Sequence, residues 1–547
     1  MGPKPTMPEM LRRRANDHPD ETFIEDVSND KTWSNRDFYL ETLRVGDALA
    51  ALGVGPGDRV ATMLDPSVRA HTIWIGTCWT GAVEAPLNTD YRGSSLAHAL
   101  HDSRARVLVT TASYAERLSL IAGELTELQT VVLVDEPPKT SFWPGRIALL
   151  EKLLRAAQPT ERPAPQERDP YAVVYTSGTT GPSKGVLTPW ASLYMTVEAT
   201  FPGDRAGQYP GGAIYSPWPT FHGVGKYALV VAVELGIRVV LRSRFSVSAF
   251  WDDIRSHGCT HVHLMGFGSL LLNRPMQADD ADNPLCRAIM LPLPVRFPEF
   301  ERRFGVKVST AWGMTEIGLP ISSGDPIDPA ACGRLLPEFE ARIVDENDYD
   351  VPDGSPGEFV IRSRRPWLLM TEYLGRPEAT ARAWRNGWLH TGDILRRDPD
   401  GTYYFIDRAA DYLRSKGQNI SSLEVEATVT AHPEVAACAC IGVPSDIARA
   451  NADGGTASEE GESGPGPLVD DDVKIVVIRT DGSTLTEREL FDHLVERMPR
   501  FMVPRYIEFV DDLPRTPTAK IRKGELRRTP VTDGTWDREV AGVAVPR

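Results

Sequence analysis

A short stretch of the sequence gathers glycine, hydroxyl and lysine residues directly after an apolar run. The run AVVYT at residues 172–176 is rich in β-branched residues and leads into TSGTTGPSKG at residues 176–185. Glycine lets a backbone turn tightly and approach an anion closely, hydroxyls donate hydrogen bonds, and lysine supplies a point charge. The Walker A spacing is absent. An ordinary surface turn does not need so many donors, so the stretch predicts a phosphate-binding loop made of Thr176, Ser177, Gly178, Thr179, Thr180 and Lys184.

Further segments with distinctive residues follow in order along the chain. They are AWGMTE at residues 311–316, GWLHTGDI at 387–394, DRAADYLRSKGQNISSLEVE at 407–426 and LPRTPTAKIRKGELR at 513–527. Together with the glycine-rich stretch, they resemble the signature blocks of the adenylate-forming superfamily, which includes acyl-CoA synthetases, luciferases and peptide-synthetase adenylation domains. The blocks span nearly the whole chain, so the sequence is identified as a member of that superfamily. A looser resemblance, over residues 244–265, is to the branch that contains crotonobetaine/carnitine-CoA ligases, and it does not identify the acid.

The resemblance implies an ATP-dependent carboxylic acid–CoA ligase. In the first half-reaction a carboxylate attacks the α-phosphate of ATP and gives acyl-AMP and pyrophosphate. In the second, the thiol of coenzyme A displaces AMP and gives acyl-CoA. The first two reactants are both anions, so the site must neutralise charge and hold the reacting atoms in line. Mg²⁺ is implied as well, because carboxylate oxygen is a ligand that this hard cation prefers.

The same resemblance implies roles for single residues. The phosphate-binding loop would cover the β- and γ-phosphates, Glu316 would hold Mg²⁺, and Lys520 would bridge the carboxylate and the α-phosphate. The other nucleotide contacts are implied for Trp312 on the adenine ring, Gly313 and Met314 beside it, Thr315 at the α-phosphate, Asp393 at the ribose hydroxyls and Arg408 at the ribose or phosphate. Taken singly, each has an ordinary alternative, such as core for Trp312 or a turn for Asp393. The ordered blocks weigh against those alternatives.

The stretch PWPTFHGVG at residues 217–225 resembles the family block that borders the acyl pocket. His222 matches the residue that gates entry of the carboxylate and the thiol, and it is not expected to act as a base. The acyl-pocket candidates are Trp218, His222, Phe267 and Thr310. Lys226 lies one helical turn further, in an apolar run. We expect its ammonium group to snorkel to solvent, the alternative being that it faces the pocket and pairs with the substrate.

The second half-reaction is expected to need a rotation of the C-terminal part. In the family this rotation removes the lysine matched here by Lys520 and brings in the loop matched by residues 414–419. Ala410 is the predicted hinge. Arg414 begins the loop that enters and is a candidate for coenzyme A binding. Gly417 of the same loop is a candidate for lining the thiol tunnel, because a residue without a side chain does not block a pantetheine arm. No carrier-protein segment follows the lysine block, which favours free coenzyme A. The alternatives are an adenylating enzyme that loads a separate carrier protein and a catalytically silent nucleotide-binding homologue.

The sequence departs from the family pattern at some positions. MLPLP at residues 290–294 stands where a Gly-Ala-Pro-like adenine segment is usual, and its contacts in the family are largely through backbone. Ala410 replaces the usual Asp or Lys of the hinge, and Ala519 replaces a Gly before Lys520. A hinge needs tolerant backbone angles more than charge, so rotation stays the expectation.

The elements that must position these residues alternate between helix and strand. Helical periodicity at 34–52 is followed by β-rich runs such as 59–64 and 105–110, which predicts parallel α/β layers. From about Cys332 strands are separated by Gly, Pro and Asp turns, and after Asp407 helices and strands alternate again. The predicted fold is α/β. A large N-terminal domain, residues 1–409, combines parallel α/β subdomains with a β-rich one, and a small mobile α+β lid, residues 410–547, carries a mobile loop at 451–468.

The composition limits the kinds of partner that we expect for this protein. The chain has 547 residues, with 60 Lys and Arg against 75 Asp and Glu, a net charge of −15 that argues against a general nucleic-acid binder. Six scattered cysteines do not make a disulfide framework, and no signal peptide or membrane-spanning run is evident. We therefore expect a cytoplasmic enzyme whose partners are a carboxylic acid, ATP and coenzyme A. The oligomeric state is left open, with a homodimer as one candidate.

Overall fold

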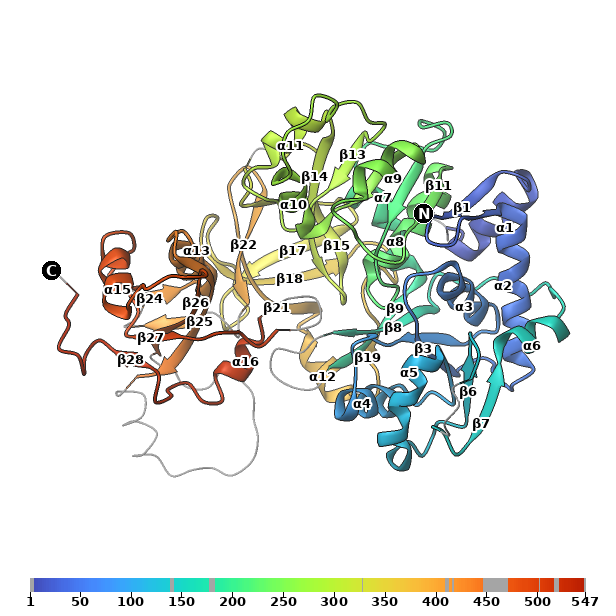
Figure 1. Ribbon diagram of the computed structural model, residues 1–547, viewed down its shortest axis with the longest axis horizontal. Coiled ribbons are helices and arrows are strands. Elements are labelled where there is room, and N and C mark those ends of the chain that lie inside the picture. The colour runs from blue at the N-terminus through green and yellow to red at the C-terminus, as the bar shows by residue number, and fades with distance from the viewer. Residues whose placement is uncertain are drawn as a thin grey trace.

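The computed structural model describes residues 4–137, 142–176, 183–326, 328–408, 413–415, 418–445, 471–500, 502–515 and 521–545, with the backbone alone at 414, 415, 418 and 419. Within these ranges the chain forms two large sheets with their helices and a separate small domain at the C-terminal end (Figure 1). None of the described helices is long and apolar enough to span a lipid bilayer.

The first sheet is mostly parallel and has the strand order β19-β9-β8-β4-β3-β5-β6-β7. Its strands are β3 (Arg59–Met63), β4 (Val83–Pro86), β5 (Val107–Thr110), β6 (Thr130–Leu133), β7 (Arg146–Leu149), β8 (Pro170–Thr176), β9 (Lys184–Pro189) and β19 (Glu372–Tyr373). Helix α2 (Asn35–Ala50) precedes the first of these strands. The helices connecting the strands are α3 (Val68–Trp79), α4 (Gly93–Ser103), α5 (Ala112–Ala115), η1 (Glu116–Leu120), η2 (Ala122–Glu124) and α6 (Leu150–Ala156). Helix α2 begins where Ser34 accepts the backbone N–H of Asp37, an N-cap that satisfies an otherwise unpaired donor.

The second sheet begins as a parallel α/β layer. Its parallel strands are β1 (Thr22–Asp26), β10 (Ala213–Ser216), β11 (Arg238–Leu241), β12 (Cys259–His263), β13 (Arg287–Ile289) and the start of β14 (Lys307–Met314), with β2 (Lys31–Ser34) antiparallel at the edge. Its helices are α1 (Met7–Asp17), η3 (Trp190–Met195), α7 (Thr196–Thr200), α8 (Gly223–Leu235), α9 (Phe250–Ser256), η4 (Met265–Phe267), α10 (Gly268–Leu272) and α11 (Phe297–Phe304). Trp74 of α3, Tyr171 of β8 and Val230 of α8 belong to one buried core, which joins the two sheets.

Strand β14 changes partner halfway along its length. Its first residues pair in parallel with β13, and from Thr310 onward it pairs antiparallel with β15 (Gly318–Ser323). The antiparallel part continues through β16 (Ala331–Leu335), β22 (Thr402–Arg408), β21 (Trp388–Arg397), β18 (Gly357–Ser363) and β17 (Phe339–Val344), with β20 (Trp384–Arg385) on β21 and α12 (Pro377–Ala383) beside them. The β-rich part thus starts at β15, earlier than the predicted start at about Cys332. The reason is that the second half of β14 already pairs antiparallel with β15.

The C-terminal elements form a small α+β unit with a sheet of its own, at one end of the molecule in Figure 1. It contains the hairpin β23 (Leu413–Ser415) and β24 (Gln418–Ile420), then α13 (Ser422–Thr430), β25 (Val435–Pro444), β26 (Asp471–Arg479), α15 (Glu487–Val495), β27 (Tyr506–Phe509), α16 (Lys523–Leu526) and β28 (Trp536–Asp537). The predicted fold class and most predicted elements are confirmed. The predicted mobile loop at 451–468 lies outside the described residues, and the boundary at 409/410 stays a prediction.

Candidate active site

The predicted phosphate-binding loop joins two antiparallel strands of the first sheet. Strand β8 ends at Thr176 and β9 begins at Lys184, and these two residues pair with each other. The Thr176 hydroxyl donates to the Lys184 carbonyl at 3.4 Å, so both ends of the loop are held together. Residues 177–182, which include the predicted Ser177, Gly178, Thr179 and Thr180, lie outside the described residues.

A tight hairpin presents Thr315 and Glu316 at the end of β14. Met314 pairs with Gly318, so the chain reverses over the residues between them. At Gly313 an added Cβ would lie 1.8 Å from the Gly318 carbonyl oxygen, a distance that no side chain tolerates. Glycine at 313 is therefore required by the close approach of two backbones, and this approach sets the position of Glu316.

Glu316 keeps one carboxylate oxygen available in a buried place. Its side chain is only 5% exposed, and its Oε1 accepts a hydrogen bond from the Tyr373 hydroxyl at 3.0 Å. Its Oε2 is buried and has no hydrogen-bond partner among the described residues. Burial raises the pKa of Glu316, against the lowering effects of its own backbone N–H, the Tyr373 hydroxyl and the charges of Arg408 and Lys184. The single orphaned oxygen suits a hard divalent cation, since a buried polar atom needs a partner.

Tyr373 connects Lys184 with Glu316. Strand β19 pairs with β9 at Tyr373 and Val186, and Lys184 Nζ lies 5.0 Å from the centroid of the tyrosine ring. The Met370 backbone N–H donates to the Glu316 carbonyl at 2.7 Å, so the segment before β19 is tied to the β14–β15 hairpin. The sequence interpretation missed Tyr373. A lone tyrosine on a two-residue strand gives no periodic signal, and only the sheet pairing shows its place.

Asp393 lies in a bulge of β21 opposite Arg408. The two residues pair across β21 and β22, and Arg408 Nε lies 2.8 Å from Asp393 Oδ1, while Asp393 is only 2% exposed. On the other side of β21, Glu358 pairs with Ile394 and Val360 with His390, so the residues 391–393 face a single residue of β18. Such a bulge redirects a side chain away from the ordinary strand alternation.

Glu358 holds this bulge together. Its Oε1 accepts the Gly392 backbone N–H at 3.0 Å, and its Oε2 lies 2.9 Å from His390 Nδ1 and 3.2 Å from Arg385 Nη2. Burial acts to raise the pKa of Glu358, but the hydrogen bonds to His390 and Gly392, together with the charges of His390 and Arg385, lower it overall. The residue was not predicted, although it lies in the strand GEFVIRS, because its role depends on pairing with β21.

The predicted acyl-pocket residues lie among aromatic rings. Trp218 stacks on Phe245 with a centroid distance of 5.9 Å and an interplanar angle of 13°, and Phe267 lies 5.3 Å from Trp218 and 4.7 Å from Phe245. His222 is the N-cap residue of α8, with its ring 4.6 Å from that of Phe221. The structure therefore brings Trp218 and Phe267 together and adds Phe245, which the sequence interpretation missed.

Two predicted residues are partly engaged in packing. The Thr310 hydroxyl is buried and donates to the Met290 carbonyl at 3.0 Å. Trp312 packs edge-on against Phe359, with a centroid distance of 5.2 Å and an interplanar angle of 76°, and lies 6.4 Å from Phe405. Both positions thus serve the core, and an adenine contact by Trp312 stays a prediction.

The expectation that Lys226 snorkels to solvent is wrong. Its side chain is 0% exposed, and its Nζ lies 2.5 Å from Oε2 of Glu84, whose side chain is 1% exposed. Snorkelling requires a path from the helix to water, and the first turn of α8 faces the core between the two sheets. A buried ammonium group needs a counter-charge, and β4 supplies it.

The remaining predicted residues were assigned to the C-terminal part of the chain. Lys520, Ala410 and Gly417 lie outside the described residues, and Arg414 is described only as backbone in β23. Close to the lysine segment, Lys523 Nζ donates to the Ser422 hydroxyl at 2.5 Å and lies 2.8 Å from Glu426. Arg515 pairs with Ile521 across the intervening residues, so both ends of the predicted lysine segment are held by this unit.

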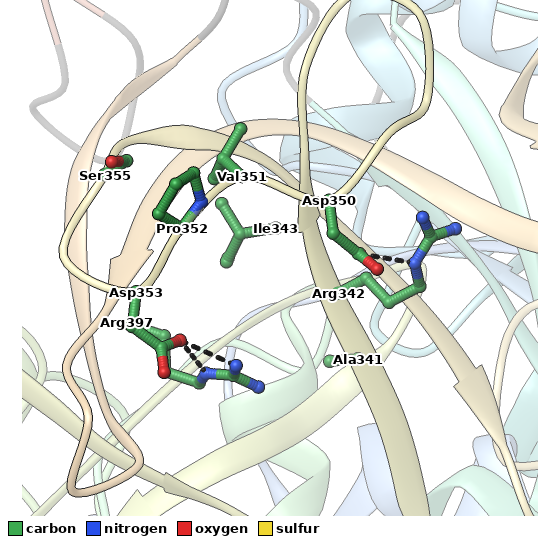
Figure 2. Close-up of a pocket in the computed structure, with 9 residues that line it drawn as sticks. All are labelled: Ala341, Arg342, Ile343, Asp350, Val351, Pro352, Asp353, Ser355 and Arg397. Atoms are coloured by element: carbon green, nitrogen blue, oxygen red, sulfur yellow. Dashed lines mark hydrogen bonds and ion pairs between the residues drawn. The ribbon is translucent and has the colours of Figure 1, made fainter.

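A small cavity of about 140 Å³ lies in the β-rich part, away from all the predicted residues. Figure 2 shows Arg342 directed at Asp350 and Arg397 at Asp353, with N–O distances of 2.6 Å and 2.7 Å. Its charged groups are thus neutralised by one another. The convergence of Lys184, Tyr373, Glu316, Arg408 and Asp393 is the stronger candidate for a site that binds an anion with a cation.

Comparisons with known proteins agree with this arrangement. A family model described as AMP-binding enzyme matches residues 11–374, and one described as AMP-binding enzyme C-terminal domain matches residues 470–520. The crotonobetaine/carnitine–CoA ligase of Salmonella paratyphi A is 30% identical over 507 residues, which cover 89% of this chain and 91% of that protein. That of Citrobacter koseri is also 30% identical, over 502 residues with the same coverage.

Solved structures agree in fold over nearly the full chain. The anthranilate CoA ligase AuaEII in complex with anthranoyl-AMP has a TM-score of 0.78 at 25% identity, covering 97% of this chain and 98% of that one. ATP-bound MatB from Rhodopseudomonas palustris has a TM-score of 0.79 at 24% identity, covering 96% and 99%. The chain therefore belongs to the AMP-binding enzyme family, within the adenylate-forming superfamily that its motifs resemble.

Proposed function

We propose that this protein is an ATP-dependent carboxylic acid–CoA ligase, which forms acyl-AMP and pyrophosphate and then acyl-CoA and AMP. The observation that carries the proposal is the convergence at one place of Lys184, the buried carboxylate of Glu316 and the Asp393–Arg408 pair. These groups come from four segments of the chain and supply charges of both signs, as recognition of a nucleotide with its cation requires. The names of the similar proteins, which are CoA ligases, support the same reaction.

Different residues of the chain would contact different parts of the nucleotide. Lys184 would neutralise the β- and γ-phosphates, and Thr315 would donate to the α-phosphate. Asp393 would accept the ribose hydroxyls, because an ionised carboxylate only accepts hydrogen bonds. Lys520, carried by the C-terminal unit, would bridge the α-phosphate and the attacking carboxylate.

Mg²⁺ fits the site through a single carboxylate. Glu316 Oε2 is the orphaned atom that would hold it, and among the described residues no group of three or more His, Cys, Asp or Glu could form a cage. Mg²⁺ commonly binds through one or two carboxylates, with phosphate oxygens and water as its other ligands. When bound, the ion would supply positive charge for the phosphate oxygens.

Coenzyme A is the proposed thiol acceptor, and the cytoplasm is the proposed location. A carrier protein as acceptor remains the alternative, and it would show as weak activity with free coenzyme A. The acid would lie beside His222, against the wall of Trp218, Phe245 and Phe267. This wall favours an acid with an apolar or aromatic part, since aromatic side chains offer large apolar surfaces.

The test is pyrophosphate release on mixing the enzyme, MgATP and single acids, followed by mass analysis of acyl-CoA. The panel contains crotonobetaine, carnitine, anthranilate, benzoate and o-succinylbenzoate, taken from the names of the similar proteins, with short alkyl acids added. We expect acid-dependent pyrophosphate release and a coenzyme A-dependent thioester with at least one acid. An enzyme that binds ATP but releases no pyrophosphate with any acid would favour the silent homologue.

A further inference from the structure

A fully buried ion pair joins the two sheets next to the acid side of the site. Lys226 Nζ on α8 lies 2.5 Å from Glu84 Oε2 on β4, and the other oxygen of Glu84 accepts the Thr62 hydroxyl at 2.7 Å. The ammonium group also lies 4.1 Å from the centroid of the Trp74 ring. Burial, with a smaller contribution from Lys226, lowers the pKa of the nearby His71 to about 3, so His71 stays uncharged and the counter-charge comes from Glu84.

The lysine end of this pair lies in the helical turn that carries the acid-side residues. His222 is the N-cap of α8, and its carbonyl accepts the Gly225 backbone N–H at 3.1 Å. An added Cβ at Gly225 would lie 2.1 Å from the Pro219 carbonyl oxygen and 2.9 Å from that of Trp218. The loop with Trp218 and His222 is thus packed directly on the turn that contains Lys226, and a shift of that turn would move both side chains.

The glutamate end lies in the sheet that carries the phosphate-binding loop. Glu84 pairs with Ala172 of β8, and β8 leads into that loop at Thr176. The ion pair is therefore a direct link between the acid-side helix and the sheet that positions the phosphates. Its partners are 142 residues apart in the sequence.

Stability alone does not account for such a pair. Taking two charges out of water costs several kcal/mol per ion, and apolar residues of similar volume are often as stable or more stable. A charged hydrogen bond is directional, however, whereas apolar packing tolerates small displacements before stability is lost. The ion pair thus costs free energy of folding, and what it provides is a defined position of the helical turn.

We propose that Lys226 and Glu84 are positioning residues for the acid, which hold the first turn of α8, and with it Trp218 and His222, at a fixed place relative to the phosphate-binding sheet. The inference rests on the proposed function in one respect, namely that the acid binds beside His222. Neither residue contacts the substrate in this account. Their effect is therefore expected in the KM for the acid and not in the KM for ATP.

The test uses the double variant Lys226→Met/Glu84→Gln in the full-length protein. Both side chains keep their volume, and the new amide at position 84 can still accept the Thr62 hydroxyl, so the variant is expected to fold with a Tm close to that of the parent. We expect the KM for the best acid of the panel to rise roughly tenfold or more, because small misplacements of bound reactants are costly. The KM for ATP is expected to change by less than about twofold, because neither substitution removes a contact with ATP.

A matched control is available in the C-terminal unit. Lys474 there pairs with Glu508, and Thr535 donates to the same carboxylate at 2.8 Å, which gives a similar but only partly buried Lys–Glu–Thr group away from the acid. The control Lys474→Met/Glu508→Gln is expected to leave the KM for the acid unchanged. A second variant, Glu84→Asp, keeps both charges but shortens the reach by one methylene, and we expect an intermediate KM for the acid. If the double variant does not fold, the KM of Glu84→Asp for the acid tests the proposal in its place.

Amide hydrogen exchange supplies a readout that needs no acid. In the ligand-free double variant, amides at 217–228 are expected to exchange at least about tenfold faster, while those at 229–235 keep their parental protection. Parental exchange at 217–228, or a parental KM for the acid, in the folded double variant or in Glu84→Asp would overturn the proposal. Failure of the proposed function would look different: the parent itself would release no pyrophosphate with any acid, while the exchange pattern would still separate the double variant from its control.

Discussion

At the scale of the residue, the side chain of Glu316 combines burial with an incomplete set of hydrogen bonds. Its pKa is raised by burial, so the ionised form is disfavoured in the folded protein. A carboxyl group of this kind stabilises the fold while it is protonated, and this contribution is lost as the pH rises through its folded-state pKa. Above that pKa the ionised Glu316 therefore costs stability, which is a common property of binding sites.

Glu316→Gln is expected to separate activity from stability. The amide is a poor ligand for Mg²⁺, so kcat/KM for MgATP should fall by about 10²–10³, the typical loss for one group that stabilises developing charge. The ligand-free variant should have a Tm equal to or above that of the parent, because a buried charge has been removed. Calorimetry and a magnesium titration check this, with Glu340→Gln, a partly exposed glutamate in the β-rich part, as control. Parental activity across the titration would contradict the assigned role.

Tyr373→Phe tests the neighbour that supports Glu316. The tyrosine hydroxyl lowers the pKa of Glu316, so its removal should raise that pKa further. Because the cation needs the ionised carboxylate, the acidic limb of the pH profile of kcat/KM for MgATP should move to higher pH. If the variant still binds the nucleotide and the acidic limb of its pH profile stays at the parental pH, Glu316 does not titrate in the pH range of that limb.

At the scale of the element, the bulge in β21 places Asp393, and Glu358 of the neighbouring strand holds the bulge. The backbone N–H of Gly392 would otherwise be left without a ladder partner, since the extra residues of a bulge interrupt the ladder. Gly392 has a φ of 68°, a conformation that glycine adopts without steric cost. The position of the Asp393 carboxylate therefore depends on Glu358, a residue of the neighbouring strand.

Glu358→Ala is expected to weaken recognition of the ribose specifically. If Asp393 accepts the ribose hydroxyls, the parent should prefer ATP over 3′-deoxy-ATP by roughly ten- to a hundredfold, the value of one hydrogen bond to a charged group. The variant should lose most of this preference. A general loss of stability would instead weaken the binding of both nucleotides equally. Competition binding measures the ratio, with Glu340→Ala on the adjacent β17 as control. A parent without the preference would refute the role of Asp393 itself.

At the scale of the whole molecule, the predicted catalytic lysine belongs to the small C-terminal unit. Leu513 packs in the same core as Ala439 and Val476 of that unit, and Lys523 is tied to α13. The segment between them is therefore expected to move with the unit when it rotates. The other residues that are predicted to bind the nucleotide, as far as the structure describes them, lie in or next to strands of the two large sheets.

Lys520→Ala is expected to affect only one half-reaction. Formation of acyl-AMP should fall by at least about 10²–10³, because a positive charge at the meeting point of two anions is lost. Transfer from synthetic acyl-AMP to coenzyme A should persist, because the rotated unit no longer presents this lysine. Quenched-flow assays of each half-reaction check this, with the exposed Arg528→Ala as control. Equal loss of both steps in a folded variant would argue against rotation.

The sequence by itself determined the family and the fold class, and it predicted which residues surround the nucleotide. The reason is that these features depend on short blocks whose residues are close together, such as 176–185 and 311–316, and on the local periodicity of helices and strands. Strand β3, for example, was predicted at residues 59–64 and lies at Arg59–Met63.

Only the tertiary structure decided which distant residues complete the site. Glu84 and Lys226 are far apart in the sequence, and Tyr373 reaches Glu316 only because β19 pairs with β9. Glu358 reaches the bulge of β21 through the register of two strands, and Phe245 joins Trp218 through a loop between elements. In each case the partner is set by sheet order and packing. A lysine in an apolar run looks the same in the sequence whether its helix faces water or, as here, a buried carboxylate.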